Sequence, residues 1–244
     1  MSANTTHTTG SSLCAETKKT LRLLGHQFRL LESDSLTLDE LSRCNERQNP
    51  FENAAQAYSS QIEKLLKYFR DRWRLSCSDE EFGGIFVPRP QGYCKTILIV
   101  HADLTGPEDI FGKWTTEQKF SVCKYTDKLL NDVVPNDRRR LGHYALLHSG
   151  RQVADEELKE KSWETNVRDR RETMRLTEAL LFEDMFFTET QEHIDPETAT
   201  LTSSRYSDGG VASVCWYRGN REVSVHWYRP QYAYPGLRAR AVSL

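Results

Sequence analysis

The chain of 244 residues has no long hydrophobic run, and its longest apolar stretch is centred on residues 97–100. Because a helix that spans a bilayer needs about 20 apolar residues, the sequence predicts no membrane span. No apolar segment follows Met1, so we also expect no secretory signal. An excess of charge of one sign is lacking too, since the formal net charge is −2. This balance does not favour nucleic acid or an anionic membrane as a partner.

Paired cysteines and metal-binding motifs are likewise missing. The six cysteines are scattered and form no CxxC pair: Cys14, Cys44, Cys77, Cys94, Cys123 and Cys215. In a chain of this length without a secretory signal, they indicate reduced thiols of an intracellular protein. We therefore predict a cytoplasmic protein with no metal site, and no pattern in the chain identifies a cofactor.

Large apolar residues are scarce in residues 1–15, which are rich in serine and threonine. Such a segment cannot bury enough apolar surface to fold, so we predict a disordered tail. The tail has no acidic residue before Glu16, as in mitochondrial transit peptides, and a mitochondrial location is the alternative to a cytoplasmic one. Residues 16–244 are predicted to form a single α+β domain.

Helices are predicted throughout residues 16–76. The widest apolar stripe has helical spacing: Tyr58, Ile62, Leu65, Leu66, Phe69 and Trp73. Such a stripe is typical of a helix that faces the core, although a partner-binding face has the same pattern.

Residues 83–150 show a mixed pattern. A short strand is predicted at 85–87, and the run TILIVH at 96–101 predicts an interior strand because it is continuously apolar and rich in β-branched residues. A helix is predicted from Thr115 or Thr116 to about Val133. Residues 144–148 fit either a strand or a short helix.

Residues 155–187 are predicted to be helical in two parts. The first, 155–172, is charged and has ion pairs at i,i+4 spacing. The second, 174–187, is strongly apolar and predicts a buried or interface helix. A long polar connection is expected over 188–210.

A β-hairpin at residues 211–228 is the strongest local prediction. Two apolar-rich runs flank Gly219-Asn220, a pair that suits a two-residue type II′ turn. This turn pairs Tyr217 with Glu222. One face of the hairpin is then apolar: Ala212, Val214, Trp216, Val223, Val225 and Trp227. A slip of one residue would mix the two faces, so the register is strongly specified.

Short, scattered strands and a helical N-terminal third favour an α+β fold. We predict a mostly antiparallel sheet of about four to five strands, packed by helices and completed by the C-terminal hairpin. No alternating βαβ pattern supports a doubly wound sheet.

His101 and Asp103 are the first candidates for catalysis. They are two residues apart, so they point the same way if the strand continues through them. A sheet would hold them rigidly at a surface, where imidazole exchanges protons near neutral pH and a carboxylate orients it. The alternative is structural, with a histidine that closes the strand and an aspartate that caps the loop.

The polar face of the hairpin is the second candidate site. Its predicted ligand-binding residues are Ser213, Cys215, Tyr217 and His226. Ser213 lies opposite His226, and Cys215 lies diagonally within reach of it. We prefer the interpretation of this face as a structural sheet face, and the lining of a small-molecule pocket is the second interpretation. A Cys–His nucleophile is the third, because a cysteine in the middle of a strand is poorly exposed.

A third stretch, Val133–Leu147, reads VVPNDRRRLGHYALL and resembles the acetyl-CoA pyrophosphate loop of the GNAT acetyltransferases. In that family an Arg/Gly-rich loop follows a strand and opens a helix. These residues fall in register with it: Arg138, Arg140 and 145–147. Leu141 and His143 replace glycines that let backbone amides approach phosphate. The resemblance implies an acyl-CoA-dependent acetyltransferase.

Two classes of function remain open. The preferred one is an interaction protein, a subunit or regulator of a larger assembly. It would bind a protein partner or a second copy through the helix at 174–187 or the aromatic-rich C-terminus. The alternative is a small-molecule-binding enzyme with a pocket between sheet and helices, using His101 and Asp103, and the acetyltransferase is more remote. The sequence leaves undecided whether the protein is an enzyme.

Overall fold

The structure, a computed structural model, describes residues 57–78, 82, 85–118, 121–135 and 137–244. Its elements follow in this order: α4 (Ser59–Tyr68), the π-helix η1 (Phe69–Trp73), β1 (Thr96–Val100), α6 (Pro107–Glu117), β2 (Ser121–Lys124), α7 (Leu130–Val133), β3 (Tyr144–His148), the 3₁₀ helix η2 (Glu156–Leu158), α8 (Trp163–Arg168), α9 (Leu176–Thr190), β4 (Ala199–Arg205), β5 (Val211–Tyr217), β6 (Glu222–Tyr228) and β7 (Leu237–Ala239). The predicted tail and the helices predicted before residue 57 lie outside the described residues.

The predicted α+β class is confirmed. Five strands form a mixed sheet in the order β2-β6-β5-β4-β7, and β1 and β3 form a second, antiparallel pair. The central strand β5 is antiparallel to both neighbours, whereas the edge strands β2 and β7 each run parallel to the strand beside them. Helices pack on these strands, as expected from the sequence.

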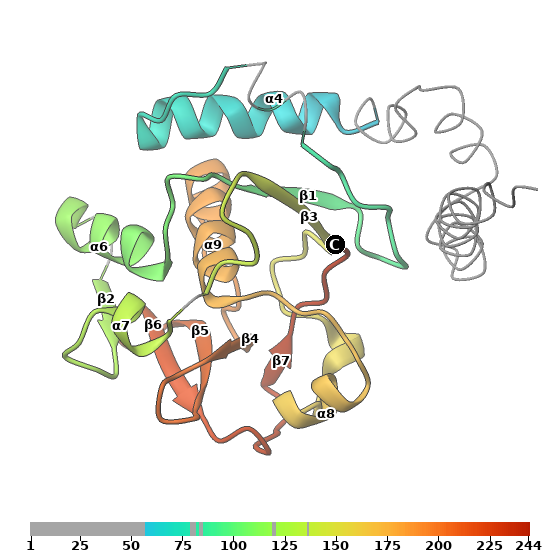
Figure 1. Cartoon of the computed structure of the whole chain (residues 1–244). Coiled ribbons are helices and arrows are strands. Elements are labelled where there is room, and N and C mark those ends of the chain that lie inside the picture. The colour runs from blue at the N-terminus through green and yellow to red at the C-terminus, as the bar shows by residue number, and fades with distance from the viewer. Residues whose placement is uncertain (1–56, 79–81, 83–84, 119–120, 136) are drawn as a thin grey trace, which may run out of the picture. The chain divides into compact units, whose positions relative to one another are not determined.

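Helix α9 is the centre of the core. Figure 1 shows it, in orange, between the β1–β3 pair and the strands of the larger sheet, and it contacts β1, β4, β5 and α6. Leu176, Ala179, Leu180 and Leu181 are fully buried. The helix predicted at 174–187 is therefore confirmed. Because every residue from Leu176 to Asp184 is buried, α9 serves as a core helix and not as an exposed interface helix.

The helix α4 packs against β1. Its predicted apolar stripe faces the core, where Leu65, Leu66 and Phe69 are buried. The interior strand predicted at 96–101 is also confirmed as β1, with its last four residues buried. The ambiguous segment 144–148 is a strand, β3, that pairs with β1.

The predicted hairpin register is confirmed, from Ala212↔Trp227 to Tyr217↔Glu222. The inward side chains at its centre are buried: Ala212, Val214, Val223 and Val225. Trp216 is partly buried, but Trp227, expected on the same buried face, has 47% of its surface exposed because it lies at the far end of the hairpin.

The turn of the hairpin differs from the prediction. Four residues, 218–221, form it, and the N–H of Arg221 donates to the carbonyl of Arg218 at 3.3 Å. The positive φ of 54° falls on Arg221 and not on Gly219. A four-residue loop preserves the same strand register as a two-residue one, which explains why the register was right and the turn type wrong.

The helix predicted over 115–133 is wrong. Helix α6 begins earlier, at Pro107, whose fixed φ suits a first helical position, and ends at Glu117 before Gln118 adopts a left-handed conformation. The carboxylate of Asp109 caps this start by accepting hydrogen bonds from the N–H groups of Thr105 and Gly106. Strand β2 and the short helix α7 fill the rest of the segment.

Three other local predictions also need correction. Residues 85–87 form no strand, and the predicted helix at 155–172 shortens to η2 and α8. The connection at 188–210 contains β4, which pairs with β5 and β7. Tertiary pairing decided these segments, since their local patterns were weak.

The outer face of the large sheet, opposite α9, is covered over only part of its width. Ala199, Leu201 and Leu237 form a small second core there, against which Trp163 of α8 and Tyr234 pack. This cover lies over β4, β7 and the start of β5, where Val211 belongs to the same small core. Further along the outer face the side chains are partly exposed: Cys123, Cys215, His226 and Tyr228.

Candidate functional site

The accessible outer face gathers polar side chains in rows across three strands. Strand β2 places Cys123 beside Ser224, and β5 places Cys215 on the other side of Ser224. One row further on, the N–H of Tyr125 donates to β6 at 3.2 Å and brings this residue next to His226. Alternate residues of a strand share a face, so both rows lie on the same side of the sheet.

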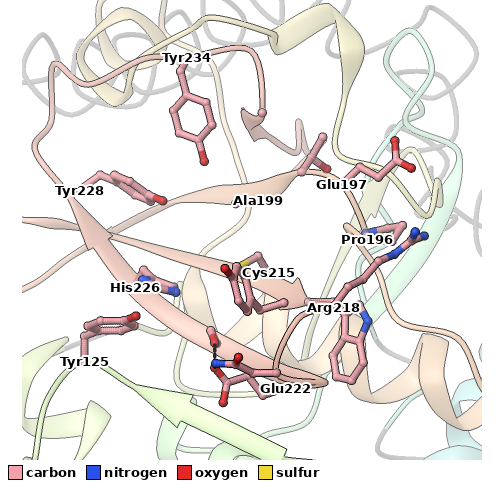
Figure 2. Close-up of a pocket in the computed structure, with 16 residues that line it drawn as sticks. Tyr125, Pro196, Glu197, Ala199, Cys215, Arg218, Glu222, His226, Tyr228 and Tyr234 are labelled. Carbon is pink, nitrogen blue, oxygen red and sulfur yellow. Dashed lines mark hydrogen bonds between the residues drawn. The ribbon is translucent and has the colours of Figure 1, made fainter.

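A concave pocket of about 640 Å³ opens over these rows (Figure 2). We call it the tyrosine pocket. Its lining residues are Tyr125, Pro196, Glu197, Thr198, Ala199, Cys215, Trp216, Tyr217, Arg218, Asn220, Glu222, Ser224, His226, Tyr228, Tyr234 and Gly236. It lies on the solvent side of the sheet and not between sheet and helices, where the sequence placed a pocket.

Aromatic rings form the walls of the tyrosine pocket. The rings of Tyr125 and His226 have centroids 4.1 Å apart, and that of Tyr228 lies 6.2 Å from that of Tyr234. Tyr228 also stacks on Tyr232, with the ring planes only 5° apart. Figure 2 shows Tyr125 and Tyr228 on either side of His226, with Tyr234 above Tyr228 in this view. Each phenol offers an apolar ring and a hydroxyl that both donates and accepts.

The polar groups of the pocket differ in whether the described residues satisfy them. Glu222 accepts hydrogen bonds from Asn220 at 3.0 Å and from Ser224 at 3.3 Å. Among the described residues, no hydrogen bond is found for the side chains of Tyr125, Arg218 or His226. These groups are therefore available to a bound ligand.

Burial keeps the central groups of the pocket uncharged at neutral pH. It raises the pKa of the Cys215 thiol to about 11, with smaller contributions from Asp195 and Glu222. It also lowers the pKa of His226, against an opposing effect of Glu222, and raises the pKa of Tyr228. A neutral thiol is a poor nucleophile, so this environment does not favour covalent catalysis by Cys215.

The structure brings together three of the four ligand-binding residues predicted on the hairpin. Cys215, Tyr217 and His226 all line the tyrosine pocket. Ser213 does not line it: this residue is fully buried opposite His226, and its hydroxyl has no hydrogen-bond partner among the described residues. The placement favours the pocket-lining interpretation over a purely structural sheet face, and ligand binding by these residues stays a prediction.

His101 is held in a structural arrangement at the end of β1. Its Nε2 bonds to the carbonyl of Ser76 at 3.1 Å, and its Nδ1 accepts from the N–H of Asp103 at 3.1 Å. A backbone N–H only donates, so Nε2 carries the proton of a neutral ring. The rings of Phe69 and Phe82 pack around it.

The carboxylate of Asp103 lies 3.7 Å from Nδ1 of His101, but 65% of its side chain is exposed. Neither residue lines the tyrosine pocket. This geometry favours the structural alternative, in which His101 closes the strand and Asp103 belongs to the loop. Acid–base catalysis by these two residues stays a prediction.

The stretch that resembles the acetyltransferase loop lacks the structural context of that loop. The helix α7, and not a strand, precedes it, and residues 144–148 form β3 where the family has a helix. The guanidinium of Arg138 donates to the carbonyls of His101, Ala102 and Gly142, each at 2.7 Å. The guanidinium of Arg138 therefore stabilises the loop through these hydrogen bonds and does not point its donors at a phosphate site.

Sequence reasoning missed four prominent residues of the pocket: Tyr125, Glu197, Tyr228 and Tyr234. Tyr125 lies inside the helix predicted over residues 115–133, so the sequence does not predict its position beside the sheet. Tyr228 ends the predicted hairpin on its polar face, so its alternation gave a usable signal. No local pattern pointed to Glu197, which comes from the connection before β4.

Other features of the described residues bear on the class of protein. Over these residues, no helix has the length and apolar character needed to cross a membrane. Their cysteines are free thiols: Cys77, Cys94, Cys123 and Cys215. No group of three His, Cys, Asp or Glu side chains in this part of the chain is arranged to hold a metal ion.

Comparison with known proteins identifies no relative: no family model, no curated protein and no solved structure matches the chain.

Proposed function

We propose that the protein acts by reversible, non-covalent recognition of a polar ligand in the tyrosine pocket, as a binding protein and not as an enzyme. The observation that carries this proposal is the difference in hydrogen bonding between His101 and His226. His101 is bonded at both ring nitrogens, whereas His226 makes no hydrogen bond to the described residues and opens into a 640 Å³ pocket. A rigid sheet with unpaired polar groups and aromatic walls is typical of a binding site.

A protein partner, the preference from the sequence, is the second candidate for the occupant. Tyr217 and Tyr232 are each about half exposed, at 55% and 48%. Tyrosine and tryptophan supply much of the binding energy in protein interfaces, so the aromatic-rich C-terminal region suits such a role.

A fragment screen tests the location of the site without assuming a ligand. Isotope-labelled full-length protein would be titrated with fragments of several classes, including saccharides, short peptides and carboxylates, and followed by NMR. We expect the largest shifts at Cys215, His226 and Tyr125. The competing cavity is a groove of about 550 Å³ between α4, β1 and α9, lined by residues such as Leu65 and Ile97. Fragments that collect there and leave the tyrosine pocket unperturbed would overturn the proposal.

A further inference from the structure

We infer that the ligand of the tyrosine pocket is a carbohydrate, an inference that rests on the function proposed above. The first argument is charge. The charged residues in the lining are Glu197, Glu222 and Arg218. One cation beside two carboxylates does not attract phosphate or nucleic acid, which bind where several cations gather. An uncharged ligand fits this balance best.

The second argument is the kind of hydrogen bond that the pocket offers. The carboxylates of Glu197 and Glu222 only accept, and the guanidinium of Arg218 only donates. The phenols and the neutral imidazole of His226 do both. A ligand that satisfies this set must donate and accept at many points, as the hydroxyls of a sugar do.

The third argument is the aromatic lining. A pyranose ring has apolar C–H faces beneath its hydroxyls, and an aromatic ring covers such a face while its polar tip stays wet. Tyr125 is well placed for this contact: it flanks His226 at 4.1 Å, and 61% of its surface is exposed. Stacking and hydrogen bonding are thus available in one open pocket.

A peptide fits the same pocket less well. Its backbone would pair with an open sheet edge, but the floor of the pocket is the face of β5 and β6, and β6 is bonded on both sides. A proline-rich segment docks on aromatic grooves without such pairing. It has few N–H groups, however, and would offer few hydrogen-bond donors to the carboxylate of Glu197.

The test begins with the full-length chain on an array of diverse glycans, and the affinity for the best glycan is then measured by calorimetry. Tyr125→Ala and Glu197→Gln should each weaken binding by about tenfold, the effect of losing one aromatic contact or one charge-assisted hydrogen bond. Trp227→Ala is the matched control, because Trp227 lies on β6 but points to the opposite face. It should leave the affinity unchanged, and melting curves would show that all variants are folded.

The outcomes separate this inference from the proposed function. If no glycan binds although fragments of other classes occupy the tyrosine pocket, the carbohydrate assignment is wrong and the binding function stands. If a glycan binds with equal affinity to the parent, Tyr125→Ala and Glu197→Gln, its site lies elsewhere and the inference is overturned. If fragments avoid the pocket altogether, both proposals fall.

Discussion

Tyr125 and His226 lie ring against ring, with centroids 4.1 Å apart and planes inclined by 32°. One follows the edge strand β2 and the other belongs to the C-terminal hairpin. The parallel pairing of β2 with β6 brings Tyr125 and His226 together. It adds the ring of Tyr125 as a wall beside a sheet face that the hairpin alone would leave flat. The pocket is thus a product of sheet assembly.

The two tryptophans of the hairpin should differ in their effect on stability. Trp216 stacks on His193, with centroids 3.6 Å apart, and packs against the main core, whereas Trp227 is 47% exposed. We expect Trp216→Ala to lower the free energy of unfolding by about 3 kcal/mol and Trp227→Ala by about 1 kcal/mol or less. Urea titration measures both free energies, and equal losses would contradict the difference in burial between the two tryptophans.

The hairpin turn offers a test of backbone strain. Arg221 has a φ of 54°, a left-handed conformation that glycine adopts without steric cost. Arg221→Gly should therefore be more stable than Arg221→Ala by about 1 kcal/mol. Both variants remove the guanidinium, so their difference in thermal unfolding isolates the backbone term. An alanine variant as stable as the glycine variant would show that residue 221 is not left-handed in solution.

His148 should make the protein sensitive to acid. Burial, together with Arg240, lowers the pKa of His148 to about 3 from an ordinary value of 6.5. Below pH 6.5 the unfolded chain binds a proton that the folded chain does not, so this contribution is complete above pH 6.5. It is then lost as the pH falls toward 3, at roughly 1.4 kcal/mol per pH unit.

A matched variant isolates this effect from other titrating groups. Burial raises the pKa of Asp137 to about 6, which stabilises the folded state as the pH falls and so opposes His148. His148→Asn keeps an acceptor for the N–H of Gly150, which bonds to Nδ1 at 3.1 Å, and retains Asp137. The difference in unfolding free energy between parent and variant should shift in favour of the variant below pH 6.5. A difference that stays constant from pH 7 to 4 would exclude a buried neutral imidazole.

Alkylation of Cys215 tests whether the pocket holds a nucleophile. Its pKa of about 11, against an ordinary 9.0, reduces the thiolate fraction at neutral pH by roughly a hundredfold. Iodoacetamide should therefore modify Cys215 in the folded protein far more slowly than in the denatured chain, as followed by mass spectrometry of the peptide. Fast modification of the folded protein would restore the Cys–His interpretation.

Short-range patterns determined much of this structure. The alternation of side chains from Ala212 to Trp227 gave the hairpin register and its apolar face, because a strand pairs with its neighbour across a turn of a few residues. The same holds for α9 and β1. The apolar segment of α9 is too long for a strand, and the run of β1 is short and rich in β-branched residues, which favours a strand. The alternation therefore places Cys215, Tyr217 and His226 on one face of the hairpin.

Only the tertiary structure decided which segments surround the outer face of the hairpin. β2 joins the sheet by pairing with a strand about a hundred residues away, and nothing in the short run Ser121–Lys124 predicts its partner or its parallel direction. The position of α8 and Tyr234 over β4 and β7 likewise decides which half of the outer face stays open. The sequence by itself determined which side chains the hairpin presents outward, because alternation is local. The tertiary structure decided that they line a pocket, because its walls come from segments that meet only when the sheet is assembled.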